Sequence, residues 1–419
     1  MKTNNTIRVM ELFAGVGGFR LGLEKANPFL FDITWANQWE PSRKTQHAFD
    51  CYTRNFKNGV HSNEDIATIS NETFEQVAPD LIVGGFPCQD YSVARSLSGE
   101  QGIQGKKGVL FWEIKRALEY SHPKYVLLEN VDRLLKSPSS QRGRDFAVML
   151  ATFRDLNYTV EWRVINAAEY GFAQRRRRVF IFAYKNGISF SNNQEQLTNE
   201  EIVYQEGFFA KPFPIKSEPV KNRVNQKSLP DDIVKISDEF SFEFHTAGVM
   251  RHGKIYTIHA DPVIQEATPL KDILLDENLV DEKFYLTSEI AEKMNYLRGP
   301  KKIERTSATG HKYVFSEGGM SPTDLLNLPG RTMLTSEGSV NRSSHIVEID
   351  GRKRFLTPIE CERLNGFPDD WTSGMTDRMR YFCMGNALVV DLVEIMGNRI
   401  AEIEDSTSTT DVQIELSFS

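Results

Sequence analysis

Short apolar runs alternate with segments of helical periodicity along the first part of the chain. The apolar runs, which predict buried strands, lie at residues 7–13, 33–36, 80–84, 125–128 and 179–183. Between them, apolar residues recur at helical spacing at residues 19–25, 108–120 and 146–156. Short buried strands that alternate with helices predict an open α/β sheet. Ligand sites in such sheets lie at the carboxyl ends of the strands.

The pattern changes in the second part of the chain. Residues 190–345 contain scattered proline, glycine and charge, which predicts a second, smaller and loop-rich domain. Regular patterns return at residues 354–368 and 386–401, and the latter predicts a helix that completes the first domain. We therefore expect a first domain at residues 1–189, a second at 190–345, and a return to the first at 346–419. The last residues, from about 404, are predicted to form a polar tail.

The composition is that of an ordinary globular protein. With 419 residues, of which 40% are hydrophobic, the chain can bury a sizeable core. No apolar run is long enough to predict a membrane span, and the first residues lack the pattern of a signal peptide. The cysteines at 51, 88, 361 and 383 form no CxxC pair. We therefore expect neither a metal site nor a disulfide framework, and a reducing, cytoplasmic setting.

The net charge of −7 argues mildly against nucleic-acid binding, because phosphate contacts need local positive charge. A basic cleft on an acidic body would reconcile the two. Four consecutive arginines, Arg175, Arg176, Arg177 and Arg178, are a candidate for such a cleft. In a strand, Arg176 and Arg178 would share one face and their neighbours the other. A solvated basic turn is the alternative.

A glycine turn follows the first predicted strand, in the segment Phe13-Ala14-Gly15-Val16-Gly17-Gly18. Small residues between a strand and a helix let a ligand approach the backbone closely. Arg20 stands where the third glycine of the dinucleotide fingerprint would be, which weakens a dinucleotide interpretation. A plain strand-to-helix turn is the alternative.

Cys88 follows the third predicted strand, in the segment GGFPCQ at residues 84–89. A cysteine after Pro87 at a strand end lies on a stiff turn, where a thiolate could act as a nucleophile. The alternative is a small buried core residue. Residues 91–108 are rich in Ser, Gly, Gln and Lys, which favours a loop able to close over a polyanion.

Glu129 ends the apolar run at residues 125–128. A carboxylate in that place is costly to bury unless it has a partner or a task. The alternative is an acid that caps the following helical segment.

These motifs, in this order, resemble those of the DNA (cytosine-5)-methyltransferases, particularly the bacterial restriction–modification enzymes. The matching segments are FAGVGG (13–18), GGFPCQ (84–89), LLENV (127–131), QRRRR (174–178), RFLTPIECERLNGFP (354–368) and GNA (385–387). The resemblance implies a Rossmann-like S-adenosylmethionine-dependent sheet with a smaller target-recognition domain. It also implies methyl transfer to carbon 5 of a flipped-out cytosine within a short sequence of double-stranded DNA.

The resemblance assigns the catalytic roles. Cys88 would add to carbon 6 of the cytosine, which makes carbon 5 able to attack the methyl group of S-adenosylmethionine. Glu129 would hold N3 and the exocyclic amine. Arg176 would hold the ring oxygen O2, and Arg178 would support the active-site loop or the carboxylate. The base that removes the carbon 5 proton stays open.

A cofactor site is implied in the same way. Its residues would be Phe13, Ala14, Gly15, Gly17, Gly18, Gln38, Trp39, Glu40, Asp65, Ile66, Pro87, Leu110 and Asn386. The family usually has an acid directly before the aromatic residue that corresponds to Trp39, for the ribose hydroxyls. Here Gln38 stands before it and Glu40 after it, so either could bind the ribose.

DNA contacts are expected mainly from the variable second domain, with the sequence-reading part at about residues 290–345. The candidates are Gln89, Ser92, Arg298, Lys301, Lys302, Arg305 and Arg331. The recognition sequence stays open. By analogy with the family we expect a monomer that protects DNA from a cognate restriction endonuclease.

Three other functions deserve comparison. An RNA cytosine-5 methyltransferase of the same fold would have a shorter insert than residues 190–345. A catalytically silent binding module would have lost the cysteine, glutamate or arginine, and all are present. A Rossmann oxidoreductase would have the third glycine.

Overall fold

The computed structural model describes residues 6–41, 43–86, 110–216, 223–307 and 310–417, with side chains up to residue 406. The chain divides into two compact units. Unit 1 comprises residues 1–170, 177–265 and 390–419, and unit 2 comprises residues 171–176 and 266–389.

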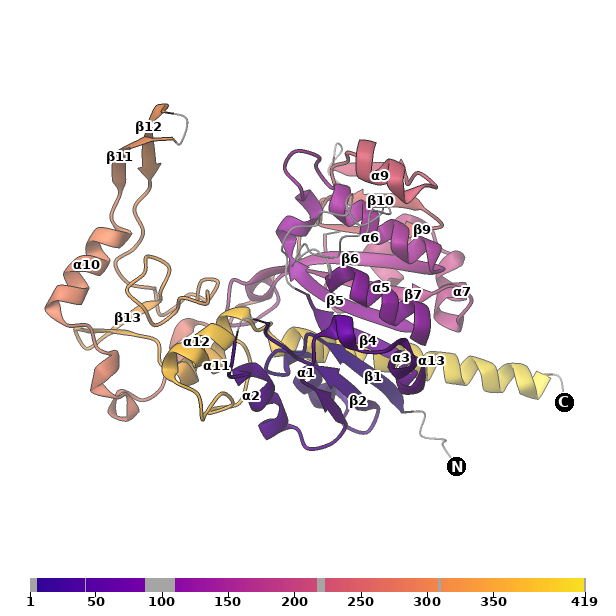
Figure 1. The fold of residues 1–419 in the computed structure, drawn as a ribbon, viewed down its shortest axis with the longest axis horizontal. Helices are drawn as coiled ribbons and strands as arrows, with labels where there is room; N and C mark the ends of the chain where they lie inside the picture. Colours follow the sequence, from indigo (N-terminus) through magenta and orange to yellow (C-terminus); the bar gives the residue numbers. More distant parts are fainter. Residues whose placement is uncertain (1–5, 42, 87–109, 217–222, 308–309, 418–419) are drawn as a thin grey trace. The chain divides into compact units, whose positions relative to one another are not determined.

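A ten-stranded sheet is the centre of unit 1, in the order β3-β2-β1-β4-β5-β7-β6-β9-β10-β8 among the described residues (Figure 1). Its strands are β1 (Ile7–Leu12), β2 (Phe31–Asn37), β3 (Val60–Ser62), β4 (Leu81–Gly85), β5 (Tyr125–Val131), β6 (Tyr158–Asn166), β7 (Arg177–Lys185), β8 (Val224–Ser228), β9 (Ala247–Arg251) and β10 (Lys254–Ile258). The five strands from β3 to β5 pair in parallel, and every pairing from β5 to β8 is antiparallel. The predicted α/β sheet is confirmed, and all five apolar runs are strands of it.

Helices separate the strands of unit 1. They are α1 (Gly18–Ala26), α2 (His47–Asn55), α3 (Asn71–Val77), α5 (Leu110–Ser121), α6 (Arg144–Asp155), α7 (Ser189–Glu195), α8 (Asn199–Glu201), α9 (Ile233–Glu239) and α13 (Val390–Ser417). None of the helices among the described residues is long and apolar enough to cross a membrane.

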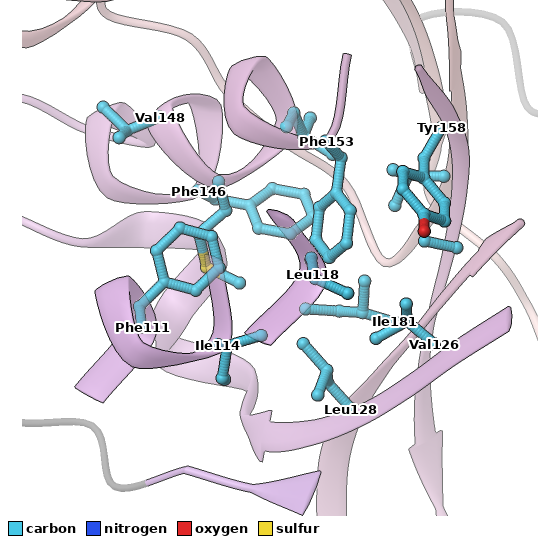
Figure 2. Close-up of a cluster of buried hydrophobic side chains, with 14 of the residues drawn as sticks. Phe111, Ile114, Leu118, Val126, Leu128, Phe146, Val148, Phe153, Tyr158 and Ile181 are labelled. Carbon is cyan, nitrogen blue, oxygen red and sulfur yellow. The ribbon is translucent and has the colours of Figure 1, made fainter. Parts of the chain in front are cut away.

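The largest core cluster lies where α5 and α6 cover the middle of the sheet (Figure 2). On α5, Phe111, Ile114 and Leu118 recur at helical spacing, so they form one apolar stripe. This stripe packs with Val126 of β5 and Phe146 of α6, both fully buried. The cluster fixes β4 and β5 beside each other, and their carboxyl ends carry the candidate chemistry.

The C-terminal helix α13 returns to unit 1 and packs on α1. A Cβ atom on Gly22 would lie 2.6 Å from Val393, so only glycine allows this close approach. Lys25 of α1 forms ion pairs with Asp391 at 2.5 Å and Glu394 at 2.9 Å. The helix predicted at residues 386–401 is therefore present, but the polar tail expected from residue 404 continues it as far as Ser417.

The segment predicted as one domain at residues 190–345 is shared between the two units. Residues up to 265 add β8, β9 and β10 to the sheet of unit 1. A two-residue turn with positive φ at His252 (50°) and Gly253 (76°) joins β9 to β10. That geometry is typical of a tight β-hairpin, and β9 and β10 pair in antiparallel register on either side of it.

Unit 2 is poorer in regular structure, as the sequence predicts. Its helices are α10 (Ser288–Arg298), α11 (Pro358–Leu364) and α12 (Asp377–Asn386). Two separate hairpins, β11 (Lys301–Thr306) with β12 (Lys312–Glu317) and β13 (Ile346–Ile349) with β14 (Arg352–Phe355), are its strands among the described residues. Buried ion pairs strengthen this unit, for example Arg354 with Glu360 at 2.8 Å, both of whose side chains are fully buried.

Candidate active site

Glu129 and Arg178 form an ion pair at the carboxyl end of β5. Because β7 runs antiparallel to β5, its first residues lie beside the last residues of β5, where Val131 pairs with Arg178. Arg178 Nε lies 2.8 Å from Glu129 Oε1, and the two side chains are only 17% and 14% exposed. A largely desolvated pair at this edge of the sheet is suited to hydrogen bonds with a ligand.

The end of β4 is built around the same carboxylate. A Cβ atom on Gly85 would lie 3.4 Å from Glu129 Oε2, so the glycine leaves this oxygen room. Asn130, which is buried, donates from Nδ2 to the carbonyl oxygen of Phe86 at 2.9 Å and accepts from the Val131 amide at 2.8 Å. Asn130 therefore ties the end of β5 to the residue before Pro87. Pro87 and Cys88 lie outside the described residues, as do Gln89 and Ser92.

Asn130 is a functional residue whose task the sequence alone did not reveal. An amide beside an acid at the end of an apolar strand is the signal that could have found it.

Arg176 lies in unit 2, where its guanidinium is buried. It donates to the carbonyl oxygens of Met333 at 3.1 Å and Gly385 at 3.0 Å. Gln174 beside it accepts from the Met333 amide and donates to Asn365. In these contacts Arg176 binds backbone carbonyls, whereas the resemblance implied that it would hold the cytosine oxygen O2. The backbone carbonyls at Met333 and near the end of α12 need donors, and Arg176 supplies them.

The four arginines alternate in burial, although only Arg177 and Arg178 belong to a strand, since β7 begins at Arg177. Arg176 is buried and Arg178 half-buried, whereas Arg175 and Arg177 are exposed. Arg177 forms an ion pair with Asp132 at 2.9 Å.

The glycine turn after β1 presents its backbone to open space. Phe13 and Gly15 both have a φ of 56°, and Gly17 has a φ of 89°. The Gly15 amide donates to Gln38 Oε1 at 2.7 Å, and a Cβ atom on Gly15 would meet no described residue within 4 Å. A Cβ atom on Gly17 would instead overlap the ring of Phe56. The turn thus leaves an open space beside the Gly15 backbone, a cradle, whereas Gly17 is packed against Phe56. Ala14 and Gly18 are buried.

Glu40 has the carboxylate beside this turn that is most free to bind a ligand. Among the described residues, its buried Oε2 has no hydrogen-bond partner, and Arg43 Nε lies 3.7 Å away. Burial raises the pKa of this carboxyl above its ordinary value. Trp39 is half-buried between Glu40 and Gln38.

The other residues expected to bind the cofactor differ in burial and in the elements that carry them. Asp65 accepts from the Ala67 amide at 3.1 Å and so caps the short 3-10 helix η1 (Ile66–Thr68), while Ile66 is a core residue. Leu110 is half-buried at the start of α5. Asn386 is exposed at the end of α12, in unit 2.

Glu11 is a buried acid that the sequence analysis missed. It lies within β1, fully buried, and the Tyr52 hydroxyl donates to its Oε2 at 2.8 Å. Its Oε1 has no hydrogen-bond partner in the part of the chain that the structure describes, and burial raises the pKa of the carboxyl to about 7. A charged residue inside the run IRVMEL was the available signal.

Arg20 explains the departure from the dinucleotide fingerprint. It is fully buried, forms an ion pair with Glu24 at 2.7 Å, and lies 4.2 Å from the ring centroid of Phe56. The side chain thus joins α1 to α2 instead of leaving room for a pyrophosphate.

Two of the arginines expected to contact DNA are internal to unit 2. Arg298 is 2% exposed and binds Asp324 at 2.9 Å, and Arg331 binds the same carboxylate at 2.6 Å. Burial opposes ionisation of Asp324, but the hydrogen bond from Arg331 and the charges of His345 and Arg331 outweigh it and lower its pKa. We therefore remove Arg298 from the candidate DNA contacts.

The other candidates lie on the β11–β12 hairpin. Lys301 donates to the Leu297 carbonyl at 2.7 Å and pairs with Glu317 at 3.3 Å. Lys302 and Arg305 are exposed.

Comparisons with known proteins show the family and the fold of the chain. The model of the C-5 cytosine-specific DNA methylase family matches residues 7–402. The Type II methyltransferase M.Sau3AI of Staphylococcus aureus is 61% identical over 412 residues, which covers 98% of this chain and 100% of that protein. The Type II methyltransferase M.HhaI of Haemophilus parahaemolyticus is 24% identical and covers 94% of each chain. The crystal structure of the S. pombe Dnmt2 methyltransferase has a similar fold, with a TM-score of 0.60 and 16% identity over 95% of this chain and 98% of that chain.

Proposed function

The chain belongs to the C-5 cytosine-specific DNA methylase family and is a DNA (cytosine-5)-methyltransferase of the Type II restriction–modification kind, and we propose that Cys88, Glu129 and Arg178 carry its chemistry. The observation that carries the proposal is the Glu129–Arg178 ion pair at the carboxyl end of β5. It lies beside the end of β4, from which the chain continues into Pro87 and Cys88.

The nucleophile is the thiolate of Cys88. It forms a bond to carbon 6 of cytosine, and the ring electrons shift toward carbon 5 and the N3–O2 side. Glu129 holds a proton at N3 and accepts from the exocyclic amine, so it stabilises the electron-rich ring. Once carbon 5 has gained the methyl group, a general base removes the proton that carbon 5 still carries, and the bond between carbon 6 and the Cys88 sulfur breaks to restore the ring.

Arg178 is the donor that we assign to the ring oxygen O2. Its Nε is bonded to the Glu129 carboxylate and its Nη1 donates to the Arg177 carbonyl, so Nη2 is the nitrogen that we assign to a base held by Glu129. Arg176 instead holds the Met333 and Gly385 carbonyls, so we assign it a positioning role within unit 2.

S-adenosylmethionine, the cofactor of this family, supplies an electrophilic methyl group when bound. The open space beside the Gly15 backbone and the unbonded, buried Oε2 of Glu40 fit such a group. We propose that Glu40 binds the ribose hydroxyls, since Gln38 Oε1 already holds the Gly15 amide. Calorimetry with S-adenosylhomocysteine tests this, because Glu40→Gln must lose affinity for the ligand but not for its 2′-deoxy analogue.

The biological substrate is double-stranded DNA. The target base lies inside a stacked duplex, so the enzyme flips the nucleotide out before Cys88 can reach carbon 6. Methylation of its own site would protect DNA from a cognate endonuclease, and we propose that the enzyme acts as a monomer.

The proposal is tested by methyl transfer from radiolabelled S-adenosylmethionine to plasmid DNA and, in parallel, to tRNA. We expect label in DNA, at cytosines of one short sequence mapped by bisulfite sequencing, and none with Cys88→Ala. Cys361→Ala is the matched control, because Cys361 is a buried core residue. Label confined to tRNA would transfer the function to an RNA methyltransferase. Full activity of Cys88→Ala would refute the assigned nucleophile.

A further inference from the structure

A cavity of about 200 Å³ lies among the described residues of unit 1, at the carboxyl ends of β6 and β10. It is lined by Arg163 and Val164 of β6, by Arg177 at the start of β7, and by residues 259–262 after β10. Since β5 and β6 both run antiparallel to β7, and β10 has the direction of β6, these ends lie at the sheet edge that carries Glu129. Ligand sites of open α/β sheets lie at that edge.

Arg163 places a buried guanidinium at this cavity. The residue is only 2% exposed. Its Nη1 donates to the Phe213 carbonyl at 2.8 Å, and its Nη2 donates to the Val203 carbonyl at 2.7 Å. Its Nε has no hydrogen-bond partner among the described residues. Because a guanidinium has five N–H donors, Arg163 retains donors for a further acceptor.

The charge of Arg163 is incompletely balanced by its neighbours. Glu161 lies on the same face of β6, and both of its carboxylate oxygens accept from the Phe208 amide, at 3.1 and 2.9 Å. Burial raises the pKa of Glu161 to about 7, so much of this carboxyl is protonated near neutral pH. Burial also lowers the pKa of Arg163 against the opposing effects of Tyr170 and Glu161, but an arginine stays charged in proteins. A buried cation of this kind is costly unless a partner binds it.

The walls of the cavity carry both donors and acids. Arg177 and His259 are exposed and contribute N–H donors. Glu169 and Asp261 are half-buried and contribute carboxylate acceptors, and Asp261 also pairs with Arg223 at 3.2 Å. A polyanion such as DNA would be repelled by these two acids. A small ligand with one anionic group and several hydroxyl groups would instead satisfy both kinds of side chain.

The size of the cavity agrees with such a ligand. Its volume of about 200 Å³ is several times the roughly 30 Å³ that a water molecule occupies in the liquid. A phosphate group alone would fill only part of this space, and a phosphorylated sugar would fill more of it. The planar fork of arginine matches the oxygens of a phosphate, and charged hydrogen bonds of this type are about twice as strong as neutral ones.

We propose that this cavity binds a small organic phosphate that carries hydroxyl groups, such as a sugar phosphate. Arg163, Arg177 and His259 hold the phosphate group, and Glu169 accepts from the hydroxyl groups. The site is separate from the cradle beside Gly15, because β4, β5 and β7 lie between β1 and β6 in the sheet. The inference goes beyond the proposed function and needs neither DNA nor methyl transfer, so loss of that function would leave it standing.

Calorimetry on the full chain tests the site with ribose 5-phosphate as the probe, in the absence of DNA and S-adenosylmethionine. Inorganic phosphate and ribose serve as partial ligands, each of which lacks one of the two recognised groups. We expect ribose 5-phosphate to bind roughly tenfold more tightly than either. No binding of ribose 5-phosphate at millimolar concentration would overturn the inference, as would equal affinities for ribose 5-phosphate and inorganic phosphate.

Matched variants of exposed residues locate the binding site. Arg177→Ala and His259→Ala remove donors from the cavity walls. Arg133→Ala and His252→Ala remove an exposed arginine and an exposed histidine that do not line the cavity. We expect Arg177→Ala to lower the affinity for ribose 5-phosphate roughly tenfold and His259→Ala to lower it by less, because the imidazole offers fewer donors. The two control variants should bind as the wild type does, and equal effects of the two pairs would overturn the inference.

Two further variants separate binding from a structural role. Glu169→Gln should weaken the binding of ribose 5-phosphate but not of inorganic phosphate, because only the sugar has hydroxyl groups for the carboxylate. An equal effect on both ligands would contradict the assignment of Glu169. Arg163→Lys keeps a cation but removes the planar fork. If thermal unfolding shows that this variant is folded, it should bind ribose 5-phosphate roughly tenfold more weakly than the wild type. If it is not folded, the variants of the exposed walls decide.

Fluorescence anisotropy of a labelled duplex tests DNA as the occupant. We expect the wild type and His259→Ala to bind the duplex with equal affinity, and ribose 5-phosphate to leave that affinity unchanged. If both the substitution and the added ligand weakened duplex binding, the cavity would be assigned to a phosphate of the DNA backbone, and the inference would be overturned.

Discussion

Arg178 donates to the carboxylate of Glu129 across two antiparallel strands, in which Val131 and Arg178, 47 positions apart in the sequence, are directly opposed. Neither side chain is fully buried, and neither is fully exposed to solvent. We propose that the pair gives up part of its mutual interaction to a third group, the ring of the target cytosine.

This relationship predicts the behaviour of two conservative variants. Glu129→Gln removes the proton-sharing group, and Arg178→Lys removes the planar fork of donors. We expect each to lower kcat by roughly 100-fold or more while the affinity for S-adenosylhomocysteine stays unchanged. Single-turnover methylation and calorimetry measure the two quantities.

Arg177→Lys is the matched control for this prediction. Arg177 is exposed and pairs with Asp132, so its variant should retain the wild-type rate. Equal losses for Arg177→Lys and Arg178→Lys would contradict the assignment of Arg178.

Glu11 predicts a pH dependence of stability. Its pKa is about 7 in the folded chain against an ordinary value of 4.5, so the folded state binds the proton more tightly than the unfolded state. Stability therefore falls as the pH rises from about 4.5 to about 7, by about 3 kcal/mol from this group alone. Glu11→Gln keeps an acceptor for Tyr52 and carries no charge.

We expect the variant to be more stable than the wild type at pH 8 and to have lost the advantage at pH 4.5. Thermal unfolding at both pH values measures this. Glu75→Gln, an exposed residue of α3, controls for the loss of one surface charge. A difference in stability that does not vary with pH would contradict the prediction.

The central fold was predictable because the strands of a parallel sheet are buried on both faces and read as continuous apolar runs. The strand β6 was not predicted from the sequence, because it contains Glu161 and Arg163, which are charged and yet buried. Glu161 accepts from the Phe208 amide, and Arg163 donates to the Val203 and Phe213 carbonyls. Those partners come from distant segments, so local hydrophobicity could not reveal them.

Likewise, only some residues of the candidate site could be placed from the sequence. Glu129 and Arg178 could be named from the order of the motifs, and their strands bring them together. The position of Arg176 could not be predicted, because its partners Met333 and Gly385 follow it by 157 and 209 residues in the sequence. Alternation in a strand places Arg176 and Arg178 on one face, but it does not say which carbonyls or carboxylates they meet.

Arg298 should act on stability and not directly on DNA. Removing Arg298 leaves the buried carboxylate of Asp324 with Arg331 as its one arginine partner, and the Ser321 carbonyl loses a donor. We expect Arg298→Ala to lower the free energy of unfolding by about 3 kcal/mol. Urea unfolding measures the loss, with the exposed Lys293→Ala of the same helix as control. Unchanged stability with weakened DNA binding would restore Arg298 to the phosphate contacts.

Substitution of the two glycines in the turn after β1 should affect ligand affinity and stability differently. A methyl group at Gly15 enters open space, so Gly15→Ala should cost about 1 kcal/mol of stability from its left-handed backbone and weaken S-adenosylhomocysteine binding roughly tenfold. A methyl group at Gly17 overlaps Phe56 in addition to the backbone strain, so Gly17→Ala should destabilise the fold by about 3 kcal/mol. Calorimetry and thermal unfolding separate the two effects. If Gly15→Ala kept full affinity for the ligand, the cradle beside this glycine would not be where the cofactor binds.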